Sequence, residues 1–168
     1  MPETTGRATP QLDDLYRDIL LDHYRKPRHK GHLDDANRKA DGANPLCGDQ
    51  VTVEARVSAD GRIEDVAFTG TGCSISQAST SMMAAFVYGR TADEALAAVG
   101  TFQTMMLTGE APPDEVGDIE ALAGVAKFPV RVKCASLGWK TLEQALKQAL
   151  KDRTVDASAP VTTDEGKE

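Results

Sequence analysis

The stretch QVTVEARVSADGRIEDVAFT (residues 50–69) carries the clearest secondary-structure pattern in the sequence. In its first half, residues 50–58, valine and alanine alternate with polar residues, which is the two-residue period of a strand with one buried face. Asp60-Gly61 predicts a tight hairpin turn, and the apolar residues of the second half predict a strand that returns antiparallel to the first. The stretch therefore predicts a β-hairpin at the centre of the fold.

The segments on either side predict one more strand and several helices. The spacing of apolar residues predicts a weak third strand within Ala36–Ala43 and a helix from Leu12 that ends before Pro27. Two more helices are predicted, one capped by Ser74 that runs to Tyr88 and one capped by Thr91 that ends before Gly109. A helical turn is expected over Asp118–Ala123, and a last helix begins after Pro129 and runs through Leu150. We expect an α+β fold, with a small three-stranded antiparallel sheet covered by about five helices.

The chain of 168 residues is long enough for one domain with a proper core. We expect that domain to span residues 12–152. The polar residues 1–11 are predicted to be a disordered leader, and residues 153–168 a disordered acidic tail.

Composition argues against several classes of partner. The net charge is −7 and only 5% of the residues are aromatic, so neither a positive field nor stacking side chains favour nucleic acid. No run of about 18 apolar residues could span a bilayer, and no apolar segment follows the N-terminus as in a signal peptide. We expect a cytoplasmic protein with neither a nucleic-acid nor a membrane partner.

The three cysteines are an odd number, and each lies at or near the end of a predicted element, where side chains can converge. Cys47 is followed by Gly48 and Asp49, so the backbone can turn a thiol and a carboxylate towards one point. With Cys73 and Cys134, this gives three thiolates and one carboxylate, a ligand set that zinc accepts. Ordinary buried cysteines would explain the same residues, and the spacing does not decide because no CxxC pair is present.

Other polar residues lie near this set in the sequence. Arg131 precedes Cys134 by three residues and could offset the negative charge of the thiolates, although a solvated arginine is the simpler interpretation. His23, His29 and His32 cluster in sequence, and we expect them to make surface or partner contacts rather than to form a second metal site.

Four motifs carry a family resemblance: DHYRKPR at 22–28, NPLCGD at 44–49, GTGCSISQAS at 70–79 and KFPVRVKC at 127–134. Together they resemble the SufU-type, zinc-dependent sulfurtransferase branch of the IscU-like (NifU N-terminal-like) iron–sulfur cluster assembly family. The resemblance covers roughly residues 12–150. The segment from Glu110 to Arg131 is long, lacks the chaperone-docking motif of the scaffold branch, and leads to Lys133 where that branch has a histidine before the last cysteine.

The resemblance implies a role for each candidate residue. Zinc would be held by Cys47, Asp49, Cys73 and Cys134, and Cys47 would accept persulfide sulfur from a SufS-type cysteine desulfurase. A histidine of the partner would displace Cys47 from the metal, with Arg131 helping to hold the exchanged state. The sulfur would pass to a downstream SUF scaffold or to apo-proteins.

Two other functions use the same residues. A scaffold could assemble a [2Fe–2S] cluster on these ligands before delivery to apo-proteins, because thiolates bind iron as well as zinc. A purely structural zinc module would use the metal only to hold the fold.

Overall fold

The hairpin predicted at residues 50–69 forms the middle of a β-sheet. The computed structural model describes residues 10–112, 116–152 and 160–162. Strand β2 (Asp49–Val57) pairs antiparallel with β3 (Ile63–Thr71), which places Val53 opposite Phe68. Strand β1 (Arg38–Asn44) pairs antiparallel with the other edge of β2. The predicted three-stranded antiparallel sheet is therefore confirmed.

The sheet also has a fourth strand that the sequence did not predict. Strand β4 (Pro160–Thr162) pairs parallel to β1, so the strand order is β3-β2-β1-β4. The polar composition of residues 153–168 predicted a disordered tail, but β-branched Val161 and Thr162 suit a strand and a proline is tolerated at its first residue. The rest of that predicted tail lies outside the described residues.

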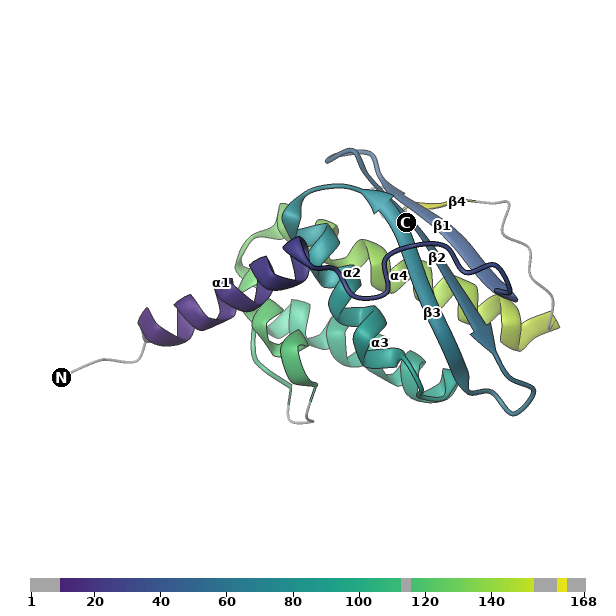
Figure 1. Ribbon diagram of the computed structural model, residues 1–168. Helices are drawn as coiled ribbons and strands as arrows, with labels where there is room; N and C mark the ends of the chain where they lie inside the picture. Colours follow the sequence, from purple (N-terminus) through teal and green to yellow (C-terminus); the bar gives the residue numbers. More distant parts are fainter. Residues whose placement is uncertain (1–9, 113–115, 153–159, 163–168) are drawn as a thin grey trace.

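Five helices accompany the sheet in the described part of the chain. They are α1 (Pro10–Arg25), α2 (Ser74–Val87), α3 (Ala92–Thr108), the 3₁₀ helix η1 (Gly117–Lys127) and α4 (Pro129–Asp152). Helix α4 packs against β1 and β2, α2 packs against α4 and β3, and the helices cover one face of the sheet (Figure 1). Helix α1 begins within the predicted leader, of which residues 1–9 lie outside the described residues.

Of two helix caps predicted from the sequence, the one at Thr91 is present and the one at Ser74 is not. Thr91 and Glu94 form the two reciprocal hydrogen bonds of a capping box at the start of α3. The predicted cap at Ser74 is wrong, because Cys73 is the N-cap of α2 and its side chain makes no capping hydrogen bond. The thiol of Cys73 therefore makes no capping hydrogen bond to the first turn of α2.

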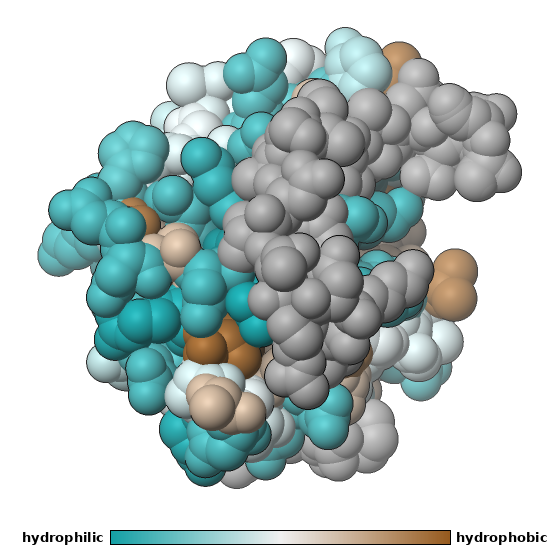
Figure 2. All heavy atoms as spheres, turned by 90° about the vertical axis from the view of Figure 1, so that its right-hand side faces the viewer, coloured by the Kyte–Doolittle hydropathy of each residue, from teal (hydrophilic) through white to brown (hydrophobic). Residues whose placement is uncertain are grey.

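The core lies between the sheet and the helices. Trp139 of α4 stacks on Phe102 of α3 with ring centroids 4.7 Å apart, and both side chains are buried. Gly138 of α4 faces Thr80 of α2 so closely that a Cβ at this glycine would clash with the threonine side chain. On the part of the face that is coloured in Figure 2, hydrophobic residues appear as small separate patches. No helix of the described residues is long and apolar enough to cross a membrane.

A buried histidine joins three helical elements. The expectation that His23 makes surface or partner contacts is wrong: it is 2% exposed, and its ring nitrogens lie 2.8 Å from Ser81 Oγ of α2 and 2.8 Å from Asp118 Oδ2 of η1. Ser81 Oγ also accepts a hydrogen bond from the Arg28 backbone N–H. The Asp118 carboxylate can only accept, so Nε2 of His23 donates to it, and in a neutral ring Nδ1 then accepts from the Ser81 hydroxyl.

We expect His23→Ala to lower the free energy of unfolding by about 2–4 kcal/mol, because it leaves a cavity and removes the hydrogen bonds of His23 with Ser81 and Asp118. The matched control is His32→Ala, whose side chain is 77% exposed and should change stability by less than about 0.5 kcal/mol. Urea unfolding of both variants measures the difference. Equal effects would show that the His23 network does not stabilise the fold.

Candidate metal centre

The four candidate ligands come from three parts of the chain that meet at one end of the sheet. Cys47 lies in the turn between β1 and β2, and Asp49 is the first residue of β2. Cys73 joins β3 to α2, and Cys134 lies in the second turn of α4. The pairing of Gln50 with Thr71 brings the two connections side by side.

The turn that carries Cys47 is held by a buried asparagine. The backbone N–H groups of Cys47 and Gly48 both donate to the Asn44 carbonyl, at 3.2 and 2.9 Å. Gly48 has a φ of 72°, a left-handed conformation that glycine adopts without strain. The turn leaves the thiol of Cys47 exposed.

Asp49 points into the protein instead of into solvent. Its side chain is 1% exposed, and Oδ1 accepts a hydrogen bond of 3.0 Å from the backbone N–H of Cys73. A Cβ at Gly72 would lie 2.6 Å from that same oxygen. The close approach of the β3–α2 connection to the carboxylate therefore requires a glycine at this position.

Two of the three sulfur atoms lie close together beside Asp49. Cys47 Sγ lies 3.2 Å from Cys134 Sγ, and ligand atoms of Cys47, Asp49 and Cys134 all lie within 4.8 Å of one another. Cys73 is outside this group of three, although its thiol is close enough to Cys134 to raise the pKa of the Cys134 thiol. Burial raises the pKa of the Cys134 thiol, and its hydrogen bonds with Cys47 and Cys73 and the negative charge of Asp49 raise it further.

The surroundings of the second carboxylate oxygen of Asp49 indicate whether the site suits a metal. Oδ2 is buried and has no hydrogen-bond partner in the described part of the structure. An unpaired oxygen of a buried acid is unfavourable unless a cation or a donor meets it. A cation next to Asp49 and the thiols would satisfy it, and a set of sulfur and carboxylate ligands suits zinc.

Arg131 lies three residues before Cys134, at the start of α4. Its side chain is exposed and, with Ser74 and Phe128, lines a groove of about 510 Å³. One helical turn separates Arg131 from Cys134. Its role in the chemistry stays a prediction.

Sequence reasoning missed an apolar rim around the centre. The rim consists of Leu46, Phe128 and Val130, whose side chains are 63%, 59% and 60% exposed. Leu46 precedes Cys47, and Val130 lies one turn before Cys134 on the same side of α4. The signal in the sequence was an apolar residue directly before Cys47 and another one helical turn before Cys134.

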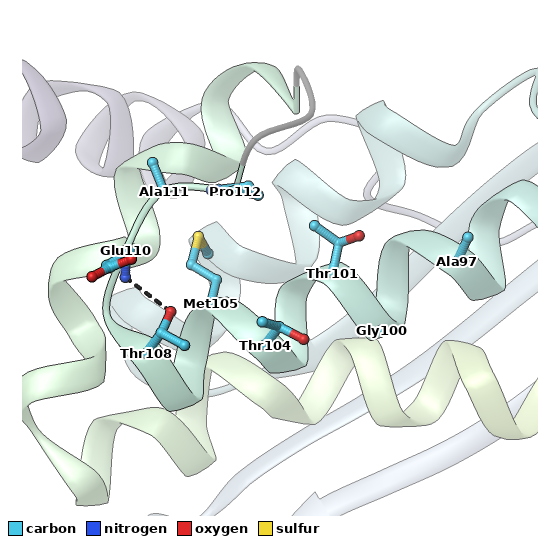
Figure 3. Close-up of a pocket in the computed structure, with 9 residues that line it drawn as sticks. All are labelled: Ala97, Gly100, Thr101, Thr104, Met105, Thr108, Glu110, Ala111 and Pro112. Atoms are coloured by element: carbon cyan, nitrogen blue, oxygen red, sulfur yellow. Dashed lines mark hydrogen bonds between the residues drawn. The ribbon is translucent and has the colours of Figure 1, made fainter.

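Another cavity lies in a different part of the molecule. It has a volume of about 540 Å³ and runs along α3, between small residues of that helix and the segment after it (Figure 3). Glu110 is the only titratable residue among those that line it. This cavity is therefore a weaker candidate for a functional site than the cysteine group.

A small α+β domain with three cysteines and an aspartate at one end of its sheet is the architecture of the iron–sulfur cluster assembly proteins. The chain belongs to the NifU-like N terminal domain family, whose profile matches residues 15–156.

Relatives support this assignment. A zinc-dependent sulfurtransferase SufU from Bacillus subtilis is 46% identical over 136 residues, which is 80% of this chain and 91% of the relative. An iron–sulfur cluster assembly scaffold protein IscU from Streptococcus pyogenes is 43% identical, over 84% of this chain and 89% of the relative. The crystal structure of a nitrogen-fixing NifU-like protein (N-terminal) from Brucella abortus superposes with a TM-score of 0.76, at 27% identity over 84% of this chain and 98% of the other.

We expect Gly72→Ala to weaken metal binding about 10- to 100-fold, because the new methyl group displaces the Asp49 carboxylate. Gly100→Ala in α3 is the matched control, since a Cβ there has no neighbour within 4 Å. Competition with a chromophoric zinc chelator measures both affinities. Unchanged affinity in Gly72→Ala would argue against Asp49 as a ligand.

Proposed function

We propose that this protein is a zinc-dependent sulfur acceptor, which takes persulfide sulfur from a cysteine desulfurase for iron–sulfur cluster assembly. The proposal rests on the difference in solvent exposure between Cys47 and the residues beside it. Cys47 is exposed, whereas Cys134 and Asp49 are buried beside it. Cys73 is half-buried. Cys47 is therefore the cysteine most accessible to a donor, whereas Cys134 and Asp49 suit a ligand role.

The transfer is a displacement at sulfur. The Cys47 thiolate attacks the terminal sulfur of the persulfide on the donor cysteine, and a new S–S bond forms. The S–S bond of the donor breaks, and its cysteine leaves as a thiolate. One persulfide is lost and one is gained, so the step needs no external oxidant or reductant.

Each ligand residue has a distinct task in this proposal. Zinc would be held by Cys47, Asp49, Cys73 and Cys134, and when bound it keeps its thiol ligands deprotonated at neutral pH. Asp49 and Cys73 hold two connections together through their 3.0 Å hydrogen bond. The turn hydrogen bonds to Asn44 present Cys47 to solvent.

We further propose the partners that the family resemblance implies. The donor would be a SufS-type cysteine desulfurase, and the sulfur would pass to a SUF scaffold or to apo-proteins in the cytoplasm. Arg131 is exposed one turn before Cys134, so its cation can approach both the partner and the ligand group. It would balance the negative charge of the thiolates during the exchange.

The second candidate is a scaffold that receives a [2Fe–2S] cluster as cargo. It is favoured by the neighbouring thiols of Cys47 and Cys134 and by the relative that is named a scaffold protein. Elemental analysis with a visible spectrum separates the two. About one zinc per chain without visible absorbance supports the acceptor, and stoichiometric iron with charge-transfer bands supports the scaffold.

Sulfur transfer itself is tested with a cysteine desulfurase supplied with ³⁵S-cysteine. We expect label on wild-type protein, released by a thiol reductant and mapped to the peptide that contains Cys47. Cys47→Ser should abolish labelling while keeping the circular dichroism of the wild type. Label on the Cys73 or Cys134 peptide in the wild-type protein would contradict the assigned acceptor.

A further inference from the structure

Two cysteines of the centre lie close enough to be joined by a covalent bond. Cys47 Sγ and Cys134 Sγ are 3.2 Å apart, although 87 residues separate them in the chain. A disulfide bond is about 2.05 Å long, so the two sulfur atoms need to approach each other by only about 1 Å. Cys47 lies in an exposed turn between two strands, and surface turns move more readily than the elements they connect.

Solvent exposure gives the two thiols different roles towards an oxidant. Cys47 is exposed, so a small oxidant in solution reaches it directly. Cys134 is 0% exposed, so the atom most available to it is the sulfur of Cys47. A surface cysteine with a second thiol beside it is the arrangement of redox-sensitive pairs, in which the second thiol forms a disulfide with the oxidised first one.

Three cysteines allow three pairings, and the structure favours one of them. Cys73 lies outside the group of ligand atoms within 4.8 Å of one another, which Cys47, Asp49 and Cys134 form. The backbone N–H of Cys73 is held by Asp49 Oδ1, and the residue is the N-cap of α2. A move of Cys73 towards Cys47 would disturb both the hydrogen bond and the helix start. The pairing of Cys47 with Cys134 disturbs neither.

We propose that Cys47 and Cys134 are an oxidation site, which peroxide converts into a disulfide bond. In the first step the Cys47 thiolate attacks one oxygen of the peroxide. A sulfur–oxygen bond forms, the oxygen–oxygen bond breaks, and hydroxide leaves and takes up a proton to give water. Cys47 is then a sulfenic acid.

In the second step the sulfur of Cys134 attacks the sulfur of Cys47. The disulfide bond forms, the sulfur–oxygen bond breaks, and the proton of the Cys134 thiol leaves with the hydroxide as a second water. The two thiols together lose two electrons, and one peroxide gains them. A thiol reductant reverses the change by thiol–disulfide exchange.

The disulfide changes what the centre can bind. It takes away two of the four proposed metal ligands, because a metal needs cysteine as a thiolate. The disulfide and the bound metal therefore exclude each other, and oxidation releases the metal. The loss of sulfur acceptance at Cys47 rests on the proposed function, but the pairing of the two thiols does not.

The pairing is tested by treating the zinc-loaded protein with hydrogen peroxide, without a desulfurase. Mass spectrometry under non-reducing conditions gives the mass of the intact chain and identifies linked peptides. We expect a chain about 2 Da lighter, in which the peptides of Cys47 and Cys134 are joined, and about one zinc released per disulfide. A chromophoric chelator measures the released zinc, and dithiothreitol should restore the original mass.

Two controls separate the folded geometry from general thiol reactivity. In Cys134→Ser the Cys47 sulfenic acid has no resolving thiol beside it, so we expect the chain to gain about 32 or 48 Da as sulfinic or sulfonic acid. The wild-type chain unfolded in urea is the second control. There the pair nearest in sequence, Cys47 and Cys73, should link most often, because the shorter loop costs less entropy to close.

Three outcomes would overturn the proposal. The first is a linked peptide of the folded wild type that contains Cys73 in place of Cys47 or Cys134. The second is a dimer linked through Cys47 as the main product, and the third is sulfinic acid at Cys47 in the wild type at the level found in Cys134→Ser. A chain that forms the expected disulfide but takes no ³⁵S from a desulfurase would count against the proposed function and leave the pairing intact.

Discussion

The hydrogen bond between the Asp49 carboxylate and the Cys73 backbone N–H is the constraint on which the site depends. It joins the start of β2, two residues after Cys47, to the connection between β3 and α2 that carries Cys73. Burial of the carboxylate makes this bond strong, because water does not compete for the oxygen. The same burial leaves Oδ2 in need of a cation.

Several local features follow from that buried carboxylate. A glycine at position 72 is required because a side chain would collide with Asp49 Oδ1. Cys73 takes the N-cap of α2 in an extended conformation, with its backbone N–H given to the aspartate. Cys134 approaches from α4, where burial and two neighbouring thiols raise its pKa. A positive ion at this point would reverse that effect and stabilise the thiolates.

Much of this arrangement is readable from local sequence signals, and the rest depends on tertiary contacts. The hairpin at residues 50–69 and the capping box of Thr91 and Glu94 use short-range rules, and both are present. The convergence of Cys47 and Cys134, 87 residues apart, follows from packing and was expected only through ligand chemistry and family resemblance. Burial of His23 escaped prediction because Ser81 and Asp118 come from distant elements. Strand β4 escaped because three residues are too few for a periodic pattern.

The central claim is that three thiols and one carboxylate form a single zinc site. Zinc K-edge X-ray absorption on the purified protein tests it most directly, because it counts the ligand atoms around the metal. The account predicts three sulfur atoms at about 2.3 Å and one oxygen at about 2.0–2.2 Å, with the oxygen lost in Asp49→Ala. A shell of nitrogen and oxygen without sulfur, or a spectrum that Asp49→Ala leaves unchanged, would contradict it.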